Sequence, residues 1–440
     1  MLDERTKEYA DKLSKLIQAE TISVENQKDK SKFYRFQDLL RELFPNIFSV
    51  SEFEDFDGSF LMRWKGKDEG EPIMLMNHQD VVEASGAWRF PPFSGVVTEG
   101  KVWGRGALDT KGGLCTMLQA ADELAKSGYI PKQDVYFVST CMEECDGSGA
   151  ATISQTLFER GVRFKLILDE GGMIVEEPLP GVKGSYAMIG VGEKGCVDLK
   201  FIARSEGGHA SMPGKDTPLV RLGKFMAAVE KQNLFKTELS PTIGEMLKRL
   251  SKRMKPSFLR FVFRHNKLVS PLLTRVMPRV STAGNAMLKT TLAFTMAGAS
   301  EGANVLPQEA WVVANMRYSH HQGGKSSIRE VKKLAKKFDI ETVVLDPGNE
   351  SPLSDYNSDA FRKIEGVVKK VFPTVITTPY IMIAASDCRY MHTLSKNCLR
   401  FTPLVIDNEQ LDSIHGIDEN VDLSTLAPAV DFYRRVIEEV

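Results

Sequence analysis

The chain has 440 residues, and its 57 Lys and Arg against 58 Asp and Glu leave a formal net charge of −1. This balance argues against a general binder of nucleic acid or other polyanions, because such proteins normally carry a basic excess. Hydrophobic residues make up 42% of the chain and charged residues 26%, which excludes a wholly disordered or fibrous protein. The length favours two or three domains with a large core.

The cysteine content and the N-terminal residues indicate the cellular compartment of the protein. The six cysteines are too sparse for a disulfide-stapled scaffold. The first 20 residues are charged and helical in pattern, without the apolar stretch of a signal peptide. No run in the sequence approaches the roughly 18 apolar residues of a membrane span. These features predict a cytoplasmic enzyme or binding protein.

Strands and helices alternate through the first part of the chain. Apolar residues at helical spacing predict helices, and short apolar runs predict buried strands. For the helix predicted at 110–127, Asp109 or Thr110 can serve as the N-cap, and Gly128 suits the position just past its end. The alternation predicts an α/β domain with a largely parallel sheet. The predicted elements are helices at 4–18 and 31–43, a strand at 72–77, a helix at 110–127, a strand at 134–140, a helix at 148–159 and a strand at 165–168.

The pattern changes near residue 190, where Gly192–Gly195 has the composition of a turn. A loop-rich break follows much later, at Asp346–Pro352. Between them lie predicted strands at 196–203, 287–297, 309–317 and 341–346 and a helix at 326–338. We predict a discontinuous α/β domain that binds metal and carries the chemistry, formed by residues 1–193 and 348–440, and an inserted α+β domain at 194–347.

Four strand-to-loop junctions carry side chains that bind metals. In open α/β sheets, sites form beyond the carboxyl ends of the strands, so separate strands can bring such side chains together. A single acidic residue at such a place is usually a helix cap or a solvated charge. The recurrence of one histidine and several carboxylates favours a metal site instead. The residues are His78, Asp80, Asp109, Glu143, Glu144 and Asp169.

The donor types restrict the metal. Histidine with carboxylates suits Zn²⁺, and also Mn²⁺ or Co²⁺, whereas all-oxygen ligands would favour Mg²⁺ or Ca²⁺. Two such ions, about 3.5–4 Å apart, need a shared carboxylate, and can deprotonate water near neutral pH and polarise a carbonyl. One of the adjacent residues Glu143 and Glu144 can bind metal while the other acts as general base. A solvated carboxylate pair would fit these two residues equally well.

Five motifs then follow one another in order. Together they resemble the M20 metallopeptidase family of aminoacylases, desuccinylases, dipeptidases and carboxypeptidases, and within it the carboxypeptidase S / Gly-X carboxypeptidase branch. The resemblance covers nearly the whole chain. It implies a zinc-peptidase-like catalytic domain with an inserted lid through which the protein forms a homodimer. The motifs are NHQDVV at 77–82, WRFPPFSG at 88–95, WGRGALDTKGG at 103–113, MEECDGSGA at 142–150 and LDEGG at 168–172.

The resemblance also implies a ligand set. His78, Asp109 and Asp169 would hold one divalent ion. Asp109 would bridge to a second ion, which Glu144 and His415 would also hold. The implied cofactor is therefore two divalent metal ions, Zn²⁺ first, with Mn²⁺ or Co²⁺ as alternatives.

The resemblance also implies roles for two residues beside the metal ligands. Asp80 would orient His78 through its ring N–H. Glu143 would be the general base and would later give its proton to the leaving amine.

The inserted domain and the last part of the chain carry further family marks. Residues 207–213 (GGHASMP) resemble a signature whose histidine, in relatives, crosses a dimer interface, so His209 would help to stabilise the tetrahedral oxyanion. Asn304 and Arg317 resemble the substrate-binding Asn and Arg of the family. Arg389 matches its S-D-x-R segment. An arginine can bind both oxygens of a substrate carboxylate, although each could instead form a structural ion pair.

One stretch of the inserted domain is unusually basic. Residues 248–279 contain ten Lys or Arg and no Asp or Glu, interleaved with Phe, Leu and Val. Such a segment can lie on a membrane surface. It can also be a helical extension that packs on the lid or on a dimer partner, or it can receive a fatty or bulky N-acyl group.

These observations predict a metal-dependent amidohydrolase that cleaves dipeptides or short peptides with a free C-terminal carboxylate. N-acyl amino acids are the alternative substrate. Two other hypotheses remain: a non-catalytic binding protein on the same scaffold, and a hydrolase with one tightly bound metal. No nucleic-acid partner is expected.

Overall fold

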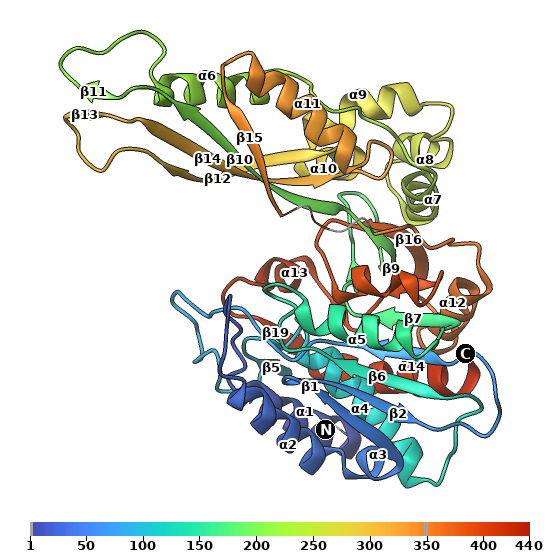
Figure 1. Ribbon diagram of the computed structural model, residues 1–440. Helices are drawn as coiled ribbons and strands as arrows, with labels where there is room; N and C mark the ends of the chain where they lie inside the picture. Colours follow the sequence, from blue (N-terminus) through green and yellow to red (C-terminus); the bar gives the residue numbers. More distant parts are fainter. Residues whose placement is uncertain (1–2, 347, 349–350) are drawn as a thin grey trace.

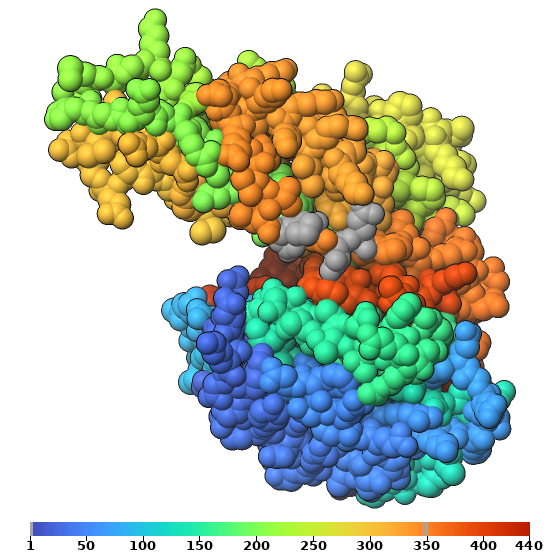
Figure 2. All heavy atoms as spheres, in the orientation of Figure 1, coloured from blue at the N-terminus to red at the C-terminus, as the bar shows by residue number. Residues whose placement is uncertain are grey.

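The computed structural model describes residues 3–346, 348 and 351–440. Figure 1 shows two bodies, which we call the main body and the lid. The main body contains the first and last helices, α1 (Glu4–Gln18) and α14 (Leu423–Glu439). Figure 2 shows the lid reaching out over the main body, with open space beneath its tip.

Within the described residues, ten strands of the main body form one mixed sheet in the order β1-β2-β6-β3-β7-β17-β9-β8-β18, with β16 paired to β9. Strands β6, β3, β7 and β17 run parallel to one another, and β1 and β2 are antiparallel additions. The predicted mixed, mostly parallel sheet is therefore confirmed. The strands are β1 (Ser51–Phe56), β2 (Ser59–Trp64), β3 (Ile73–Met76), β6 (Val135–Ser139), β7 (Leu166–Asp169), β8 (Ile174–Glu176), β9 (Ser185–Glu193), β16 (Ile376–Met382), β17 (Cys398–Arg400) and β18 (Val405–Ile406).

Helices cover both faces of this sheet, so its central strands are apolar on both sides. In β3, Ile73 and Leu75 belong to the core beneath α1, α4 and α14, whereas Met74 and Met76 pack on the α5 side. Successive strand residues point to opposite faces, which explains this division. Burial of each such side chain contributes about 1.5–3 kcal/mol. The other helices are α2 (Ser31–Leu43), α3 (Pro45–Val50), α4 (Lys111–Lys126), α5 (Ser148–Glu159), α12 (Asp359–Val371), α13 (Asn408–Ser413) and the 3₁₀ helix η2 (Asp387–Thr393).

A small sheet of β4 (Val97–Thr98), β5 (Lys101–Trp103) and β19 (Asn420–Asp422) lies beside the main one. Its β19–β5 pairing joins the C-terminal part of the chain to the loop before α4. This pairing therefore positions residues 415–419 next to Asp109.

Most predicted elements appear within a few residues of their expected bounds, but three details are wrong. The Thr110 side chain does not cap α4, since its hydroxyl donates to Asn77 Oδ1 (3.1 Å). The strand predicted from residue 287 begins at Thr291, because the preceding residues form α10 (Thr282–Leu288). The predicted turn at Gly192–Gly195 is extended instead, so that β9 passes into β10 (Gly195–Arg204) with one residue between them.

The lid contains a second, antiparallel sheet in the order β12-β14-β10-β15, with α6 and α11 packed against it. Its own apolar core includes Phe201, Phe225 and Leu334. Pro347 lies outside the described residues, so the predicted lid boundary at 347 stays a prediction. The lid elements are α6 (Pro218–Lys231), β12 (Thr291–Gly298), β14 (Glu309–Tyr318), α11 (Gly324–Lys336), β15 (Glu341–Asp346) and the distal ribbon β11 (Gly208–His209) with β13 (Val305–Leu306).

Four short helices lie at the end of the lid opposite the β11–β13 ribbon (Figure 1). They are α7 (Pro241–Leu250), α8 (Ser257–Arg264), α9 (Ser270–Val280) and α10, with the 3₁₀ turn η1 (Ser251–Arg253) after α7. Their inner residues share an apolar cluster with β9 and β16 of the main body. Among the described helices, none combines the length and apolarity needed to cross a bilayer.

Candidate metal centre and active site

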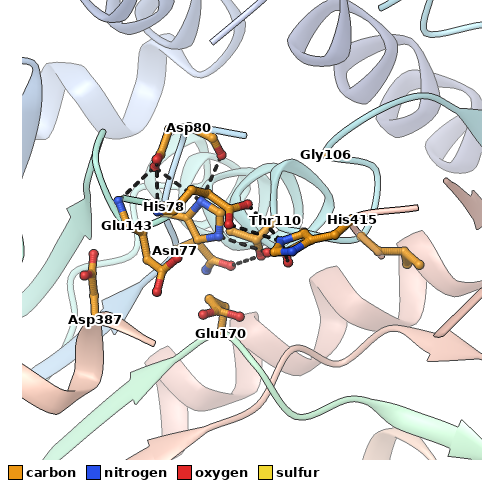
Figure 3. Close-up of polar contacts among 12 residues, drawn as sticks. Asn77, His78, Asp80, Gly106, Thr110, Glu143, Glu170, Asp387 and His415 are labelled. Carbon is orange, nitrogen blue, oxygen red and sulfur yellow. Dashed lines mark hydrogen bonds and ion pairs between the residues drawn. The ribbon is translucent and has the colours of Figure 1, made fainter. Parts of the chain in front are cut away.

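The carboxyl ends of β3, β6 and β7 meet at one edge of the main sheet, where the predicted metal-binding residues gather (Figure 3). His78 follows β3, and Glu143 and Glu144 follow β6. Asp169 is the last residue of β7, and Asp109 lies just before α4. Parallel neighbouring strands end at the same edge, so residues that are far apart in sequence become neighbours.

Asp109 lies between two imidazoles. Its Oδ1 is 2.9 Å from His78 Nε2, and its Oδ2 is 3.2 Å from His415 Nε2. His415 Nε2 is also 3.1 Å from Glu144 Oε2. Each oxygen of Asp109 thus faces a different histidine, which is the arrangement a carboxylate needs to bridge two cations.

The spacing of the ligand atoms suits a metal centre. His78, Asp109 and Glu144 each offer one donor atom, and these atoms all lie within 4.8 Å of one another. The donors are one imidazole nitrogen and two carboxylate oxygens, with the His415 nitrogen beside them. This mixture suits Zn²⁺ and related transition metals.

Asp80 contacts both His78 and the turn that carries Glu143 and Glu144. The His78 Nδ1–H donates to the backbone carbonyl of Asp80 (2.9 Å), while the Asp80 carboxylate lies 3.4 Å from Nδ1. That carboxylate accepts hydrogen bonds from the backbone N–H of Glu143 (3.2 Å) and Glu144 (3.1 Å) and from the Ser23 hydroxyl (2.6 Å). Asp80 therefore couples the position of His78 to that of the two glutamates.

Glu143 and Asp387 approach the centre from the side opposite His415 (Figure 3). Burial, above all, raises the pKa of Glu143 well above its ordinary value. Burial and the neighbouring Asp169 raise the pKa of Asp387 to about 7. A carboxylate whose pKa is raised in this way can hold and release a proton near neutral pH.

Asp169 and Glu170, the two acidic residues of the LDEGG motif at the end of β7, differ in their contacts. Asp169 accepts hydrogen bonds from the backbone N–H of Glu170 (2.9 Å) and Cys388 (2.7 Å), so both its oxygens have partners. The Glu170 carboxylate has no hydrogen-bond donor among the described residues, and it faces the centre in Figure 3. Sequence reasoning chose Asp169 and missed Glu170, although the adjacent acidic pair was the available signal. Asp169 as a metal ligand stays a prediction.

Glu419 supports the loop that carries Asp109, and the sequence reasoning did not single it out. Its buried carboxylate accepts hydrogen bonds from the backbone N–H of Gly106 (3.0 Å), Leu108 (2.8 Å) and Asp109 (3.1 Å). It also pairs with the buried Arg105 at 2.9 Å. Four donors to one carboxylate fix the loop backbone, and the Asp109 carboxylate with it.

The electrostatics of the cluster favour bound cations. Burial raises the pKa of Glu170 well above its ordinary value and that of Asp169 to about 6. Burial also raises the pKa of Glu144, and the Asp109 charge adds to this effect. Hydrogen bonds to Asp109 and Glu144 raise the pKa of His415 to about 10. Carboxylates this crowded and enclosed need positive charge nearby, so the residues present fit divalent ions.

The predicted substrate residues lie in three places. Arg389 is half-buried beside the centre, where it and Glu143 influence each other electrostatically. Arg317 lies at the root of the lid, and its buried Nη1 has no hydrogen-bond partner among the described residues. His209, in β11, and Asn304, just before β13, lie at the lid tip, so the structure does not bring them to the centre of the same chain (Figure 1).

An apolar cavity of about 230 Å³ adjoins the centre. Gly171 and Ile414, which line it, directly follow Glu170 and precede His415. Burial, and then the nearby Glu170 carboxylate, raise the pKa of Tyr380 in its wall. The outer wall comes from α7 and α10, including Met246 and Met287. The cavity therefore extends from the carboxylate cluster to the helices of the lid.

Comparison with known proteins gives concordant results. Peptidase family M20/M25/M40 matches residues 74–439. "Probable carboxypeptidase S-like 2" of Dictyostelium discoideum is 32% identical, over 98% of this chain and 85% of that protein. "N-fatty-acyl-amino acid synthase/hydrolase PM20D1" of Homo sapiens is 31% identical, over 96% of this chain and 86% of that protein.

A solved structure confirms the fold. The M20 family metallo-carboxypeptidase Sso-CP2 from Sulfolobus solfataricus superposes with a TM-score of 0.73 over 99% of each chain, at 14% identity. The two relatives, which align over nearly the whole chain, and the family match over residues 74–439 agree with the motifs around the centre. This chain belongs to the M20 peptidase family and is an enzyme of the metallopeptidase and amidohydrolase class.

Proposed function

We propose that this protein is a dinuclear-metal amidohydrolase that cleaves an amide whose amine side is an amino acid with a free carboxylate. The observation that carries the proposal is the position of Asp109, whose two oxygens face His78 and His415 separately. A carboxylate shared in this way can serve two ions at once.

The residues around Asp109 divide into two ligand groups. His78 would hold one ion with Asp169 or with Glu170, whose carboxylate faces the centre. Glu144 and His415 would hold the other. Zn²⁺ is the first candidate, with Mn²⁺ and Co²⁺ as alternatives, because the donors mix imidazole and carboxylate. Bound ions would polarise the scissile carbonyl and acidify the attacking water.

Glu143 would move the proton. Its carboxylate takes a proton from the attacking water and then donates it to the nitrogen of the leaving amine. Its raised pKa, caused by burial, suits both steps near neutral pH. Asp80 holds the backbone N–H of Glu143, so the base is kept at a fixed distance from His78.

Arginines and the lid would complete the site. Arg389 lies beside Glu143 and could bind the substrate carboxylate, and the buried unpaired Nη1 of Arg317 is a second candidate. His209 would donate to the oxyanion from the lid of a dimer partner. The position of its β11 strand at the lid tip, away from the centre of its own chain, supports a contribution in trans (Figure 1).

The acyl side of the substrate has two candidates. Short peptides and dipeptides are the first class, in keeping with the peptidase family to which the chain belongs. The apolar cavity beside Glu170 and His415 favours a second class, amino acids that carry a long N-acyl chain. Burial of a chain in such a cavity contributes about 0.8 kcal/mol per methylene. The name of the human relative, an N-fatty-acyl-amino acid synthase/hydrolase, agrees with this class.

The variant Glu143→Gln tests the proton-transfer role. We expect turnover to fall by about 10²–10⁴-fold while both metals remain bound, because the amide cannot accept a proton. The measurements are kcat on a dipeptide and on an N-acyl amino acid, and the metal content after dialysis. Glu159→Gln, on α5, is the matched control. Undiminished turnover in Glu143→Gln would disprove the assignment.

The metal requirement has a separate test. Chelation should abolish hydrolysis, and titration with Zn²⁺, Mn²⁺ or Co²⁺ should restore it at two equivalents per chain. Full restoration at one equivalent would instead support a hydrolase with one tightly bound metal. The same preparation, assayed on dipeptides and on N-acyl amino acids of increasing chain length, would separate the two substrate classes.

A further inference from the structure

Helices α8 and α9 with the five residues between them, a segment that we call the α8–α9 hairpin, carry a group of exposed apolar residues. Phe258, Phe261 and Leu268 are 70%, 58% and 81% exposed. Single exposed apolar residues are ordinary, but a group confined to two consecutive short helices and the turn between them is not. We call this group the outward face; its residues are Phe258, Phe261, Leu268, Leu272, Val276 and Val280.

The outward face is not needed for the core. A second set of apolar residues on the same helices, Val262 and Leu273 with Leu259, Phe263 and Met277, packs inward against the cluster shared with β9 and β16. On α9 and the turn before it, the outward residues recur every fourth position, from Leu268 to Val280, so they form one stripe. Each helix is therefore anchored on one side and apolar on the other.

The surrounding charge has a single sign. Of the ten cations between residues 248 and 279, Lys248 and Arg249 pair with Glu245, and Arg249 also pairs with Glu365. The other eight have no carboxylate partner in an ion pair anywhere in the described part of the chain. They are Lys252, Arg253, Lys255, Arg260, Arg264, Lys267, Arg275 and Arg279.

This charge decides among the surfaces that could cover the hairpin. A symmetric dimer through the outward face would bring two sets of the same cations together. An anionic lipid surface offers both an apolar interior for Phe258 and Leu268 and negative head groups for the cations. We propose that the α8–α9 hairpin is a docking surface for an anionic lipid bilayer, on which the enzyme rests without crossing the membrane.

The location of the hairpin is compatible with catalysis on the membrane. Figure 2 shows the segment in yellow at the outer edge of the lid, at the end away from the β11–β13 ribbon. Helices α7 and α10, which flank the hairpin in sequence, line the apolar cavity beside the metal centre. The binding itself does not depend on the substrate, so it can be tested separately from the proposed function.

The test is sedimentation of the full-length protein with vesicles. We expect binding to vesicles that contain phosphatidylserine, weaker binding to phosphatidylcholine alone, and a fall in binding as salt rises above about 0.15 M. Activity on a short, soluble dipeptide should be the same with and without vesicles, which keeps the readout independent of the acyl chain.

Two triple variants separate the apolar and the electrostatic contributions. Phe258→Ser with Phe261→Ser and Leu268→Ser should lower the partition coefficient at least about 100-fold, because three apolar side chains no longer enter the bilayer. Lys255→Gln with Arg264→Gln and Lys267→Gln should lower it by about 100-fold, since each cation near an anionic surface contributes about 1 kcal/mol. All six residues are exposed, so both variants should keep the wild-type fold and dipeptidase activity.

Matched controls lie elsewhere on the lid. Leu219→Ser with Val220→Ser and Met296→Ser removes exposed apolar residues, and Lys325→Gln with Lys332→Gln and Lys336→Gln removes exposed cations. Both controls should bind vesicles as the wild type does. Failure of the wild type to sediment with anionic vesicles overturns the proposal. An equal loss in the controls also overturns it, and so does an oligomer that the hairpin variants dissociate without any vesicle binding.

Discussion

Lys111 is a buried lysine whose Nζ contacts the end of the first helix. Its Nζ donates to the backbone carbonyls of Leu16 (3.0 Å) and Ala19 (2.6 Å), the residues where α1 ends. Helix-terminal carbonyls lack partners within the helix, so a buried donor stabilises them. Burial lowers the pKa of Lys111 from 10.5 to about 7.

This pKa predicts a pH dependence of stability. Between pH 7 and 10.5 the unfolded chain keeps a proton on Lys111 that the folded chain has released, so this group raises the unfolding free energy as pH rises. In Lys111→Met, the slope of unfolding free energy against pH should be smaller by up to about 1.4 kcal/mol per pH unit. Denaturant unfolding at several pH values measures this slope. Lys325→Met, at an exposed site, should leave it unchanged; identical slopes in the wild type and Lys111→Met would refute the prediction.

The other informative residues are acids that look alike in sequence but differ in what they contact. Asp80 binds backbone N–H groups of the glutamate turn, and Glu419 binds those of the Asp109 loop. Asp109 and Glu144 face imidazoles instead. Each contact is made across the sheet edge, so sequence spacing alone could not distinguish these acids.

At the scale of elements, the helices of the lid and the strand ends of the main body share the apolar cavity. Helix α10 contributes Ala283 and Met287, α7 contributes Met246 and Leu250, and β16 contributes Tyr380 and Ile381. A change on α10 can therefore alter the cavity without touching the residues that surround Asp109.

Met287→Trp should narrow the cavity. We expect kcat/KM for an amino acid with a long N-acyl chain to fall at least about tenfold, because a few methylenes would lose their apolar surroundings. Hydrolysis of the N-acetyl analogue should change by less than about twofold. Met296→Trp, on the exposed side of β12, controls for the bulk of the new side chain. Equal losses on both substrates would contradict an acyl-binding role for the cavity.

At the scale of the whole molecule, the lid tip lies away from the centre that His209 would serve (Figure 1). The chain passes from β9 to β10 with a single residue between the strands, and the lid helices α7 to α10 pack on β9 and β16 of the main body. If His209 acts, it acts on the centre of a second copy, as in a dimer in which each lid completes the partner's site.

Mixing two inactive variants tests this arrangement. His209→Ala and Glu143→Gln should each be nearly inactive alone. After subunit exchange, half of the dimers contain one of each chain, and one of their two sites has both residues, so about a quarter of the wild-type activity should return. The control mixes His209→Ala with the double variant Glu143→Gln, His209→Ala. This mixture should restore no activity, because neither chain supplies His209. Absence of recovery in the first mixture, with exchange verified by mass, would contradict action in trans.

Local patterns were enough to predict much of this protein. Helical spacing located α1, α2 and α5, because the period of apolar residues depends on neighbours in the chain. The metal-type residues at strand ends were also predictable, since parallel strands end at one edge. The turn predicted at Gly192–Gly195 was wrong because pairing of Gly192 and Glu193 with β16 keeps that stretch extended.

The sequence by itself determined the fold class and the family. It also determined the net charge of −1, in which the acidic residues of the centre and the basic residues of the hairpin both count. Only the tertiary structure decided which oxygen of Asp109 faces which histidine, and that Asp169 contacts backbone while Glu170 faces the centre. It also decided that Phe258 and Leu268 face outward rather than into the core. These features depend on how separate elements meet in space, for example His415 with Asp109 and Cys388 with Asp169, and such contacts leave no periodic signal in the chain.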